Sequence, residues 1–357
     1  MDFIIENAMQ TAKQNQIEDV NIGHANIKVF GCGGGGSNAT DWLFKKGLQG
    51  AEIFALNTDK QHLDLVQADR KILIGRDLTR GLGCGGYPER GREAAKENLT
   101  EIREAMRKCD MVFITAGLGG GTGTGSAPVV AQLAKEMGAI VIGTVTMPFD
   151  IERARIDKAE FGLQQLRDVC DTVIVIDNNK LVSIAGNLPI QQAFAVANEL
   201  ISTMIKGIVE IIAVPSLVNL DYADVKAIMA NGDVSVIGIG ESDSERRVDE
   251  AVKRALSNPL LEVSYEGATG ALIHITGGSD LTLDEVSKAG DMITEALDES
   301  ANVIWGARID KNMTGKFRIM TIVTGVNSPY ILGKVRHDTA ATVSMSEELG
   351  IDLVHRY

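Results

Sequence analysis

Three segments of this chain each combine an apolar strand, a glycine-rich loop and a following helix. The clearest runs from Met111 to Pro128, where the strand Met-Val-Phe-Ile-Thr leads into a loop with glycine at five of the seven positions from Gly119 to Gly125. Glycine lets the backbone turn its N–H groups toward one point, and the next helix adds unpaired N–H groups and the positive end of its dipole. The segment therefore predicts a binding site for an anion.

Hydroxyl side chains alternate with the glycines of this loop and add hydrogen-bond donors, which a flexible linker does not require. A single loop of this kind is still a weak signal, because glycine-rich turns also serve as simple connections. The candidate anion-binding residues of this loop are Gly119, Gly120, Gly121, Thr122, Gly123, Thr124 and Gly125.

Two earlier loops have the same context. Gly31–Asn38 follows a predicted strand at Asn26–Phe30 and satisfies G-x-G-x-x-G, which keeps a dinucleotide-binding fold open. Thr79–Pro88 follows a predicted strand at Lys71–Gly75 and precedes a charged helix from about Glu89 to Arg107. One polyphosphate that contacts all three loops explains them more simply than three unrelated turns.

The alternation of strands and helices continues after these loops. Further strands are predicted at Ala51–Leu56, Ala139–Met147 and Thr172–Ile176, which gives an α/β fold with a doubly wound parallel sheet. A long apolar helix then begins at Pro189, since proline suits the first helical turn and apolar residues recur at helical spacing. Its wide apolar stripe predicts a helix buried between two domains.

Beyond Pro215, predicted strands and helices alternate again and indicate a smaller α+β domain. Its strands are expected near 234–239, 271–276, 303–309 and 317–323. The predicted organisation is a helical arm at 1–25, a ligand-binding domain at 26–188, a central helix at 189–213, the smaller domain at 214–325 and a tail at 326–357.

Composition narrows the class of ligand and partner. The net charge of −13 argues against a nucleic-acid partner, because phosphate backbones are bound by clustered Lys and Arg, but a free nucleotide with a divalent cation is compatible. No apolar run approaches the ~18 residues of a membrane span, and the acidic N-terminus does not resemble a signal peptide, so we expect a cytoplasmic protein without membrane insertion. The four cysteines and five histidines are scattered, which predicts reduced thiols and no protein metal centre.

Several polar side chains lie where a nucleotide would need them, and each has a structural alternative. Asp59 follows a strand, where it suits a ribose hydroxyl or the vicinity of a phosphate-bound Mg²⁺, and a capped turn is an equally good interpretation. Phe194 and Asn198 are four residues apart on the central helix and could meet a flat base, although core packing also explains Phe194. Glu152 and Arg155 could hold a sugar and phosphates, or form an ion pair at a helix start.

An acidic pair introduces the helix after Pro215. Asp221 and Asp224 stand at i and i+3, which is the usual spacing of an N-cap and a first-turn acid. The spacing alone does not decide between a helix cap and a catalytic pair.

With these motifs in their order, residues 26 to 325 resemble the FtsZ family, the prokaryotic cell-division GTPases related to tubulin. Gly119–Gly125 matches the family signature, and Asn57-Thr-Asp59, Asn178 and the segment Asn219–Lys226 occur in family order. The resemblance implies a cytoplasmic protein at the division site that forms head-to-tail filaments. Its ligands would be GTP or GDP, with Mg²⁺ held mainly through the phosphates.

The resemblance also implies roles for individual residues. Phe194 would stack on guanine, Asn178 and Asn198 would contact the edge of the base, and Glu152 and Arg155 would lie near the ribose and phosphates. Asp221 and Asp224, with Asn219, would act on the nucleotide of a neighbouring subunit. Besides the Gly119–Gly125 loop, the residues implied in nucleotide binding are Gly33, Gly34, Asn38, Asn57, Asp59, Cys84, Gly85 and Gly86.

The chain also departs from the family pattern. Family members usually have one more residue between the positions of Glu152 and Arg155, Cys84 and Tyr87 replace alanine and asparagine, and Asp177 stands where proline is frequent. The sequence ends Leu-Val-His-Arg-Tyr without the long linker and terminal peptide that bind membrane tethers, so division-protein or membrane-anchor partners are expected but not identified.

Two alternatives remain open at this point. A nucleotide-dependent scaffold or specialised paralogue with slow GTPase activity fits the altered loop at Thr79–Pro88. A dinucleotide-dependent oxidoreductase fits Gly31, Gly33 and Gly36 but leaves the other two glycine loops without a role.

Overall fold

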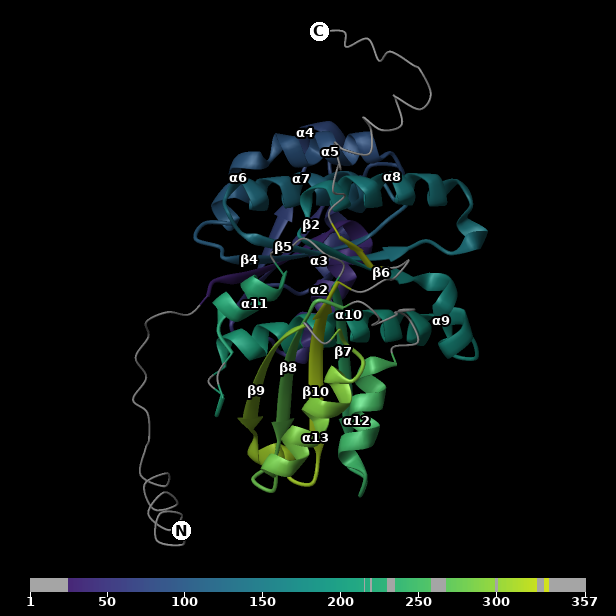
Figure 1. Ribbon diagram of the computed structural model, residues 1–357. Coiled ribbons are helices and arrows are strands. Elements are labelled where there is room, and N and C mark those ends of the chain that lie inside the picture. The colour runs from purple at the N-terminus through teal and green to yellow at the C-terminus, as the bar shows by residue number, and fades with distance from the viewer. Residues whose placement is uncertain are drawn as a thin grey trace, which may run out of the picture.

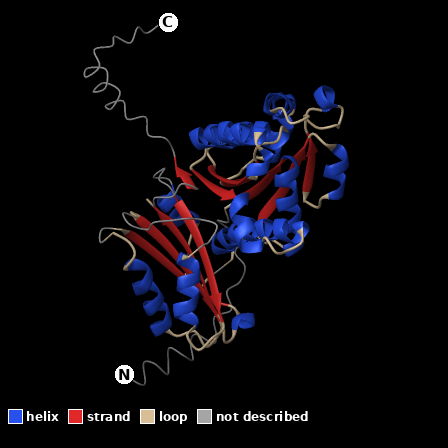
Figure 2. Ribbon diagram, turned by 90° about the vertical axis from the view of Figure 1, so that its right-hand side faces the viewer, coloured by secondary structure: helices blue, strands red, loops and turns tan. Residues whose placement is uncertain are grey.

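The computed structural model describes residues 25–214, 216–218, 220–229, 235–257, 268–298, 301–325 and 331–333. These residues form two α/β lobes with one long helix between their sheets (Figures 1 and 2). The predicted helical arm lies outside the described residues except for Ala25, and so does most of the predicted tail.

The first lobe is built on a seven-stranded sheet in the order β11-β6-β5-β4-β1-β2-β3. Six strands are parallel, and only β11 at the edge runs antiparallel to its neighbour. The strands are β1 (Ile27–Cys32), β2 (Ala51–Asn57), β3 (Arg70–Leu73), β4 (Met111–Gly117), β5 (Ile140–Met147), β6 (Thr172–Asp177) and β11 (Ile331–Gly333).

Helices cover both faces of this sheet because its central strands are apolar on both sides. One face packs against α2 and the long helix α10, and the other packs against α5 to α8 (Figure 1). On the latter face the rings of Phe30 and Phe54 stack with centroids 4.6 Å apart. The helices of this lobe are α2 (Gly33–Lys46), α3 (Lys60–Leu65), α4 (Arg76–Thr79), α5 (Pro88–Glu97), α6 (Leu99–Ala105), α7 (Thr122–Glu136), α8 (Ala154–Val169) and α9 (Asn178–Ala185), with a 3₁₀ turn η1 (Asp150–Glu152).

Helix α10 (Ile190–Ala213) joins the two lobes. Its side chains Ile201, Met204, Ile205 and Ile208 are at most 2% exposed and belong to one core with strands of both sheets. This arrangement follows from the wide apolar stripe of the sequence, since a helix that is apolar over most of its circumference must be buried on more than one side.

The second lobe has a four-stranded mixed sheet in the order β7-β10-β8-β9, in which only β8 and β9 are parallel. Helices α12 and α13 cover the face away from α10 (Figure 2). The elements are α11 (Tyr222–Met229), β7 (Ser235–Ser242), α12 (Arg247–Leu256), β8 (Gly270–Gly277), α13 (Leu283–Thr294), β9 (Asn302–Ile309), η2 (Lys311–Met313) and β10 (Phe317–Thr324). The predicted fold class, a doubly wound sheet with a long helix and a smaller α+β domain, is confirmed.

Three local predictions were wrong or incomplete. The charged helix expected from Glu89 to Arg107 is two helices, because Asn98 leaves helical geometry and its Oδ1 accepts a hydrogen bond from the N–H of Gly75 at 2.9 Å. Helix α9 was not expected; the side chain of Asp177 caps it by accepting from the N–H of Asn179 at 2.8 Å. Strand β11 falls in the predicted tail and extends the first sheet.

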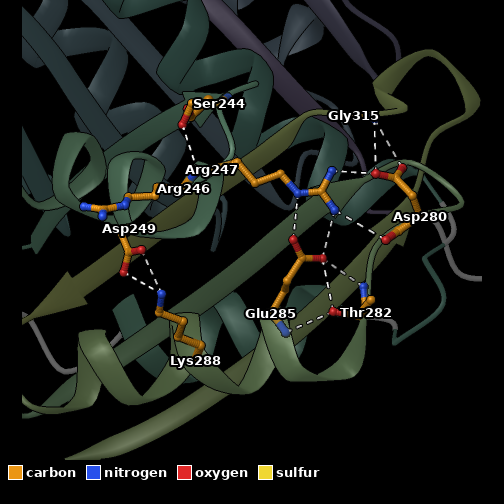
Figure 3. A network of polar contacts seen from close by, with 10 residues as sticks. Ser244, Arg246, Arg247, Asp249, Asp280, Thr282, Glu285, Lys288 and Gly315 are labelled. Carbon is orange, nitrogen blue, oxygen red and sulfur yellow. Dashed lines mark hydrogen bonds and ion pairs between the residues drawn. The ribbon is translucent and has the colours of Figure 1, made fainter.

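A charged network ties the helices of the second lobe to a neighbouring loop (Figure 3). The guanidinium of Arg247, whose side chain is 13% exposed, donates to both carboxylate oxygens of Glu285 at 2.7 and 2.9 Å and to Asp280 at 2.5 Å. Asp280 also accepts from the N–H of Gly315 at 3.2 Å, and Glu285 forms a capping box with Thr282. Hydrogen bonding from Arg247 lowers the pKa of both carboxyls.

We expect Arg247→Met to lower the free energy of unfolding by about 2 kcal/mol at neutral pH, because Glu285 loses two charge-assisted hydrogen bonds. Since the pKa values of Glu285 and Asp280 are lowered on folding, the contribution is complete above their ordinary values, 4.5 and 3.8, and is lost as the pH falls below them. Urea unfolding of the wild type and the variant between pH 7 and 3 measures this difference.

Arg246→Met is the matched control, because Arg246 is exposed and its substitution removes the same charge one residue away. An equal loss of stability in both variants, or a loss in Arg247→Met that does not change with pH, would contradict the assigned role of the network.

Candidate functional site

The three glycine segments meet at one edge of the first sheet, beyond the carboxyl ends of β1 and β4. Helix α2 begins at Gly33 and α7 at Thr122, so the later glycines of two segments lie in the first turn of a helix and not in the loop before it. The sequence pattern places these glycines in loops before the helices. Their position in the first helical turn favours anion binding. The unpaired N–H groups of two helix starts lie beside each other at this edge.

The backbones at this edge approach each other too closely for side chains. A Cβ on Gly35 would lie 3.0 Å from the Cα of Gly117, and a Cβ on Gly33 would lie 2.5 Å from the amide nitrogen of Gly123. A Cβ on Gly121 would lie 2.7 Å from the Cβ of Cys84. The contacts thus form a row that runs from the end of β4, past the start of α2, to the loop at Thr79–Pro88.

The Thr79–Pro88 loop ends in a tight turn over residues 84–87, in which the N–H of Tyr87 donates to the carbonyl of Cys84 at 3.3 Å. The φ angles of Gly85 and Gly86 are +62° and +79°, which glycine adopts at little cost. Among the described residues, the N–H groups of these two glycines have no hydrogen-bond acceptor. A turn that presents consecutive free N–H groups is a nest for an anion.

Side-chain hydroxyls connect the segments. The hydroxyls of Thr58 and Thr122 are 2.7 Å apart, and the thiol of Cys84 donates to Thr58 at 3.4 Å. In α7 the hydroxyl of Thr124 accepts from the N–H of Gly119 at 2.9 Å. These contacts hold the predicted phosphate-binding residues in one unit; the space at Gly34 and Gly120 remains open, because a Cβ there would meet nothing within 4 Å.

A cavity of about 390 Å³ lies at the other end of the row, between α10 and the strand ends. Phe194 is 42% exposed there, so it is not a core residue. Its ring meets that of Phe149 edge to face, with the ring centroids 5.8 Å apart. Asn178 is buried, and its Oδ1 has no hydrogen-bond partner. A buried acceptor without a partner beside an aromatic face suits a flat ligand with N–H donors, such as a purine base. Residues that line the cavity include Asn38, Gly117, Thr146, Asn178, Phe194 and Asn198.

Asn38 and Asn57 are connected by His62, which the sequence interpretation missed. The Nδ2 of Asn57 lies 3.2 Å from Nδ1 of His62, and the Nε2 of His62 lies 3.0 Å from Oδ1 of Asn38. Asp59 caps α3 by accepting from the N–H of His62 at 3.1 Å, so the capped turn is present. The sequence contains one indication of this network. His62 stands three residues after the predicted cap Asp59, and the N3 residue of a helix lies close to its N-cap.

Glu152 and Arg155 form an ion pair of 2.5 Å, and Glu152 also accepts from the N–H of Phe149 at 3.0 Å. The pair therefore stabilises the start of α8, as the structural alternative predicted. It also lies next to the glycine segment, because a Cβ on Gly119 would lie 2.9 Å from the carbonyl oxygen of Arg155.

The acidic pair lies at the opposite edge of the sheet. Asp221 and Asp224 cap each other's N–H groups, both at 2.9 Å, at the start of α11. The hydroxyl of Tyr222 donates to the carbonyl of Asp110, immediately before β4 begins, whereas the glycine segment follows the end of β4. Seven residues of strand separate these points by about 20 Å. Asn219 lies outside the described residues.

The described residues contain no cluster of three His, Cys, Asp or Glu side chains that could hold a metal ion. They also contain no helix that is long and apolar enough to cross a membrane. The four cysteines are buried and form no disulfide; burial raises the pKa of Cys32, Cys109 and Cys170 to about 12.

Comparison with known families matches two sequence models. The GTPase domain of the Tubulin/FtsZ family matches residues 26–186, and the C-terminal domain of the FtsZ family matches residues 233–327. The chain is 57% identical over 334 residues to cell division protein FtsZ 2 of Methanocaldococcus jannaschii, covering 93% of this chain and 88% of that protein. It is 50% identical over 339 residues to cell division protein FtsZ 2 of Halobacterium salinarum, covering 93% and 86%.

Solved structures agree with these matches. An empty FtsZ dimer of M. jannaschii is similar with a TM-score of 0.78 and 49% identity, covering 90% of this chain and 92% of that chain. A GTPγS-bound protofilament of CetZ2 from Haloferax volcanii has a TM-score of 0.72 at 22% identity, covering 91% and 100%, and this likeness supports the fold alone. Nothing in these comparisons supports an oxidoreductase.

The close approach of the glycine segments predicts different outcomes for two adjacent glycines. Gly121→Ala should lower the free energy of unfolding by about 1–3 kcal/mol, because its Cβ would meet Cys84 and the backbone of Tyr87 although its φ of −82° permits alanine.

The matched control is Gly120→Ala, whose Cβ meets nothing within 4 Å, and we expect its stability to stay within about 0.5 kcal/mol of the wild type. Thermal or urea unfolding without nucleotide makes the comparison. Equal stability of the two variants would show that the segments do not pack as described.

Proposed function

The chain belongs to the FtsZ family of tubulin-related GTPases, and from this premise we propose that its GTPase site is completed by the next subunit of a head-to-tail filament. Membership makes it a GTP-binding cytoskeletal protein of cell division. The observation that carries the finer proposal is the separation of the two halves of the site. The glycine segments and the acidic pair lie at opposite edges of the same sheet.

The proposed nucleotide position follows the row of close contacts. The cavity beside Phe194 would hold guanine, whose N1–H and N2–H groups suit the unpartnered Oδ1 of Asn178. Asn198 and Asn38 line the same cavity, and His62 connects Asn38 to Asn57. The glycine segments and the turn at 84–87 would hold the phosphates. Glu152 and Arg155 would lie beside the ribose and phosphates.

Backbone N–H groups and helix starts supply most of the positive potential of this cradle, because it contains no P-loop lysine motif. We propose that Mg²⁺ accompanies the nucleotide and is held mainly through its phosphates. The ion would neutralise charge that develops during phosphoryl transfer.

Hydrolysis would require assembly for a geometric reason. An acid that orients the attacking water must lie within hydrogen-bonding distance of it. The Asp221–Asp224 pair of one subunit is about 20 Å from its own cradle along β4. When subunits stack head to tail, the acidic edge of one faces the cradle of the next, and the pair would then position the water.

The proposed function also implies a location and partners. We expect the protein in the cytoplasm at the division site, with itself as the principal partner and with division-protein or membrane-anchor partners in addition. Nothing in its charge favours nucleic acid, given the net charge of −13.

The acidic pair can be tested without removing its helix cap. Asp224→Asn keeps an oxygen that accepts from the N–H of Asp221, so α11 should stay capped, while the negative charge is lost. We expect GTP affinity within about twofold of the wild type, a loss of GTP turnover of about 10²-fold or more, and inhibition of wild-type turnover when the two are mixed.

Asp224→Ala removes the hydrogen bond to the N–H of Asp221 as well as the charge, while Asp221 still accepts from the N–H of residue 224, so comparing it with Asp224→Asn separates the loss of that hydrogen bond from the loss of charge. Turnover of Asp224→Asn at the wild-type rate would contradict catalysis by the pair, and a defect that does not affect mixed wild-type filaments would contradict action between subunits.

A further inference from the structure

Lys158, on the first turns of α8, contacts the glycine turn at 84–87. Its ammonium donates to the carbonyl of Gly86 at 2.7 Å and lies 5.5 Å from the centre of the Tyr87 ring, over its face. The side chain is half-buried. Lys158 thus approaches the loop from a different element, and the ring of Tyr87 forms part of the surface that it contacts.

The charge of Lys158 is not neutralised by a carboxylate within the described part of the chain. Its contacts there are a carbonyl oxygen and an aromatic face, and no acid lies within 4.0 Å of its ammonium. Arg155, one turn earlier on α8, is instead paired with Glu152 at 2.5 Å. In a chain of net charge −13, an unpaired ammonium beside a nest of free N–H groups adds positive potential where an anion is expected.

Both ends of one peptide unit are held in this turn. Lys158 bonds the carbonyl of Gly86, and the N–H of Tyr87 in the same peptide unit bonds Cys84 at 3.3 Å. Glycines with positive φ on a surface loop lose much conformational entropy when they are ordered. Lys158 therefore fixes a turn that would otherwise sample other conformations.

The row of close contacts places this turn at the end farthest from the base cavity. Gly117 lines that cavity and packs on Gly35. Gly33 then packs on Gly123, and Gly121 packs on Cys84 and Tyr87. A nucleotide with its base beside Phe194 and its phosphates along this row would bring its last phosphate to the turn.

We propose that Lys158 is a positioning residue that lets the site distinguish nucleoside triphosphate from diphosphate. It holds the turn at 84–87 in the conformation that binds the terminal phosphate and adds one positive charge there. The inference rests on the proposed function, because it needs a nucleotide with its base in the cavity beside Phe194. The diphosphate, which lacks the last phosphate, does not depend on Lys158.

The test compares the affinities of the full chain for GDP and for a non-hydrolysable GTP analogue, measured by calorimetry below the assembly concentration. Lys158→Met should weaken the analogue about tenfold and GDP less than about twofold, since the held turn and the added positive charge act only on the terminal phosphate, which the diphosphate lacks. Lys158→Arg keeps the charge and should retain most of the discrimination.

Two further measurements separate positioning from a general structural effect. Lys96→Met removes the same charge from an exposed lysine that pairs with Glu93 on neighbouring α5, and it should leave both affinities unchanged. Without nucleotide, hydrogen exchange at the N–H of Tyr87 should be faster in Lys158→Met than in the wild type, because the turn is no longer held.

Equal losses for GDP and the analogue, or unchanged affinities for both, would overturn the proposal. Unchanged hydrogen exchange at Tyr87 would overturn the claim that Lys158 holds the turn. A wild-type protein that binds neither nucleotide would instead overturn the proposed function, so the two failures are distinguishable.

Discussion

The structure depends on backbone segments that approach each other without side chains between them. The start of α2, the start of α7 and the turn at 84–87 can meet only because Gly33, Gly121 and Gly125 lack a Cβ, which would collide with backbone atoms or with Cys84. Their close approach gathers unpaired N–H groups at one edge of a parallel sheet. Such a site binds phosphate through fixed dipoles and requires no reorganisation of long side chains, which is the arrangement that stabilises charge most effectively.

The second constraint is the rigid connection between this edge and the rest of the subunit. Helix α10 carries Phe194 and Asn198 near its start and is buried between both sheets over its later turns. The acidic pair, in turn, is tied to the sheet through Tyr222 and Asp110. A subunit built this way keeps its acids away from its own cradle. This separation is why we propose that the next subunit of a filament supplies them, which would make hydrolysis depend on assembly while binding does not.

Much of the fold could be predicted from the sequence, because apolar periodicity and glycine punctuation mark strands and helix starts locally. Contacts between residues distant in the sequence could not be predicted in this way. Asn98 interrupts a helical pattern because it bonds Gly75, and β11 joins the sheet from a segment with no strong strand pattern. Within the site, the glycine segments were found, but His62 and Lys158 were not, since each acts on residues distant in sequence. Local spacing also left Asp221 and Asp224 undecided; the structure shows that they cap a helix, and their action on a neighbouring nucleotide stays a proposal.

GTP turnover per subunit as a function of protein concentration, with Mg²⁺ present and light scattering recorded in parallel, tests the central claim most directly. An active site that forms between subunits predicts a negligible specific rate below a threshold concentration and a rise in rate that accompanies the rise in scattering. A specific rate that does not depend on concentration would mean that each subunit holds a complete site, and scattering without turnover would mean a scaffold that binds nucleotide and assembles without hydrolysis. Either result would contradict this account.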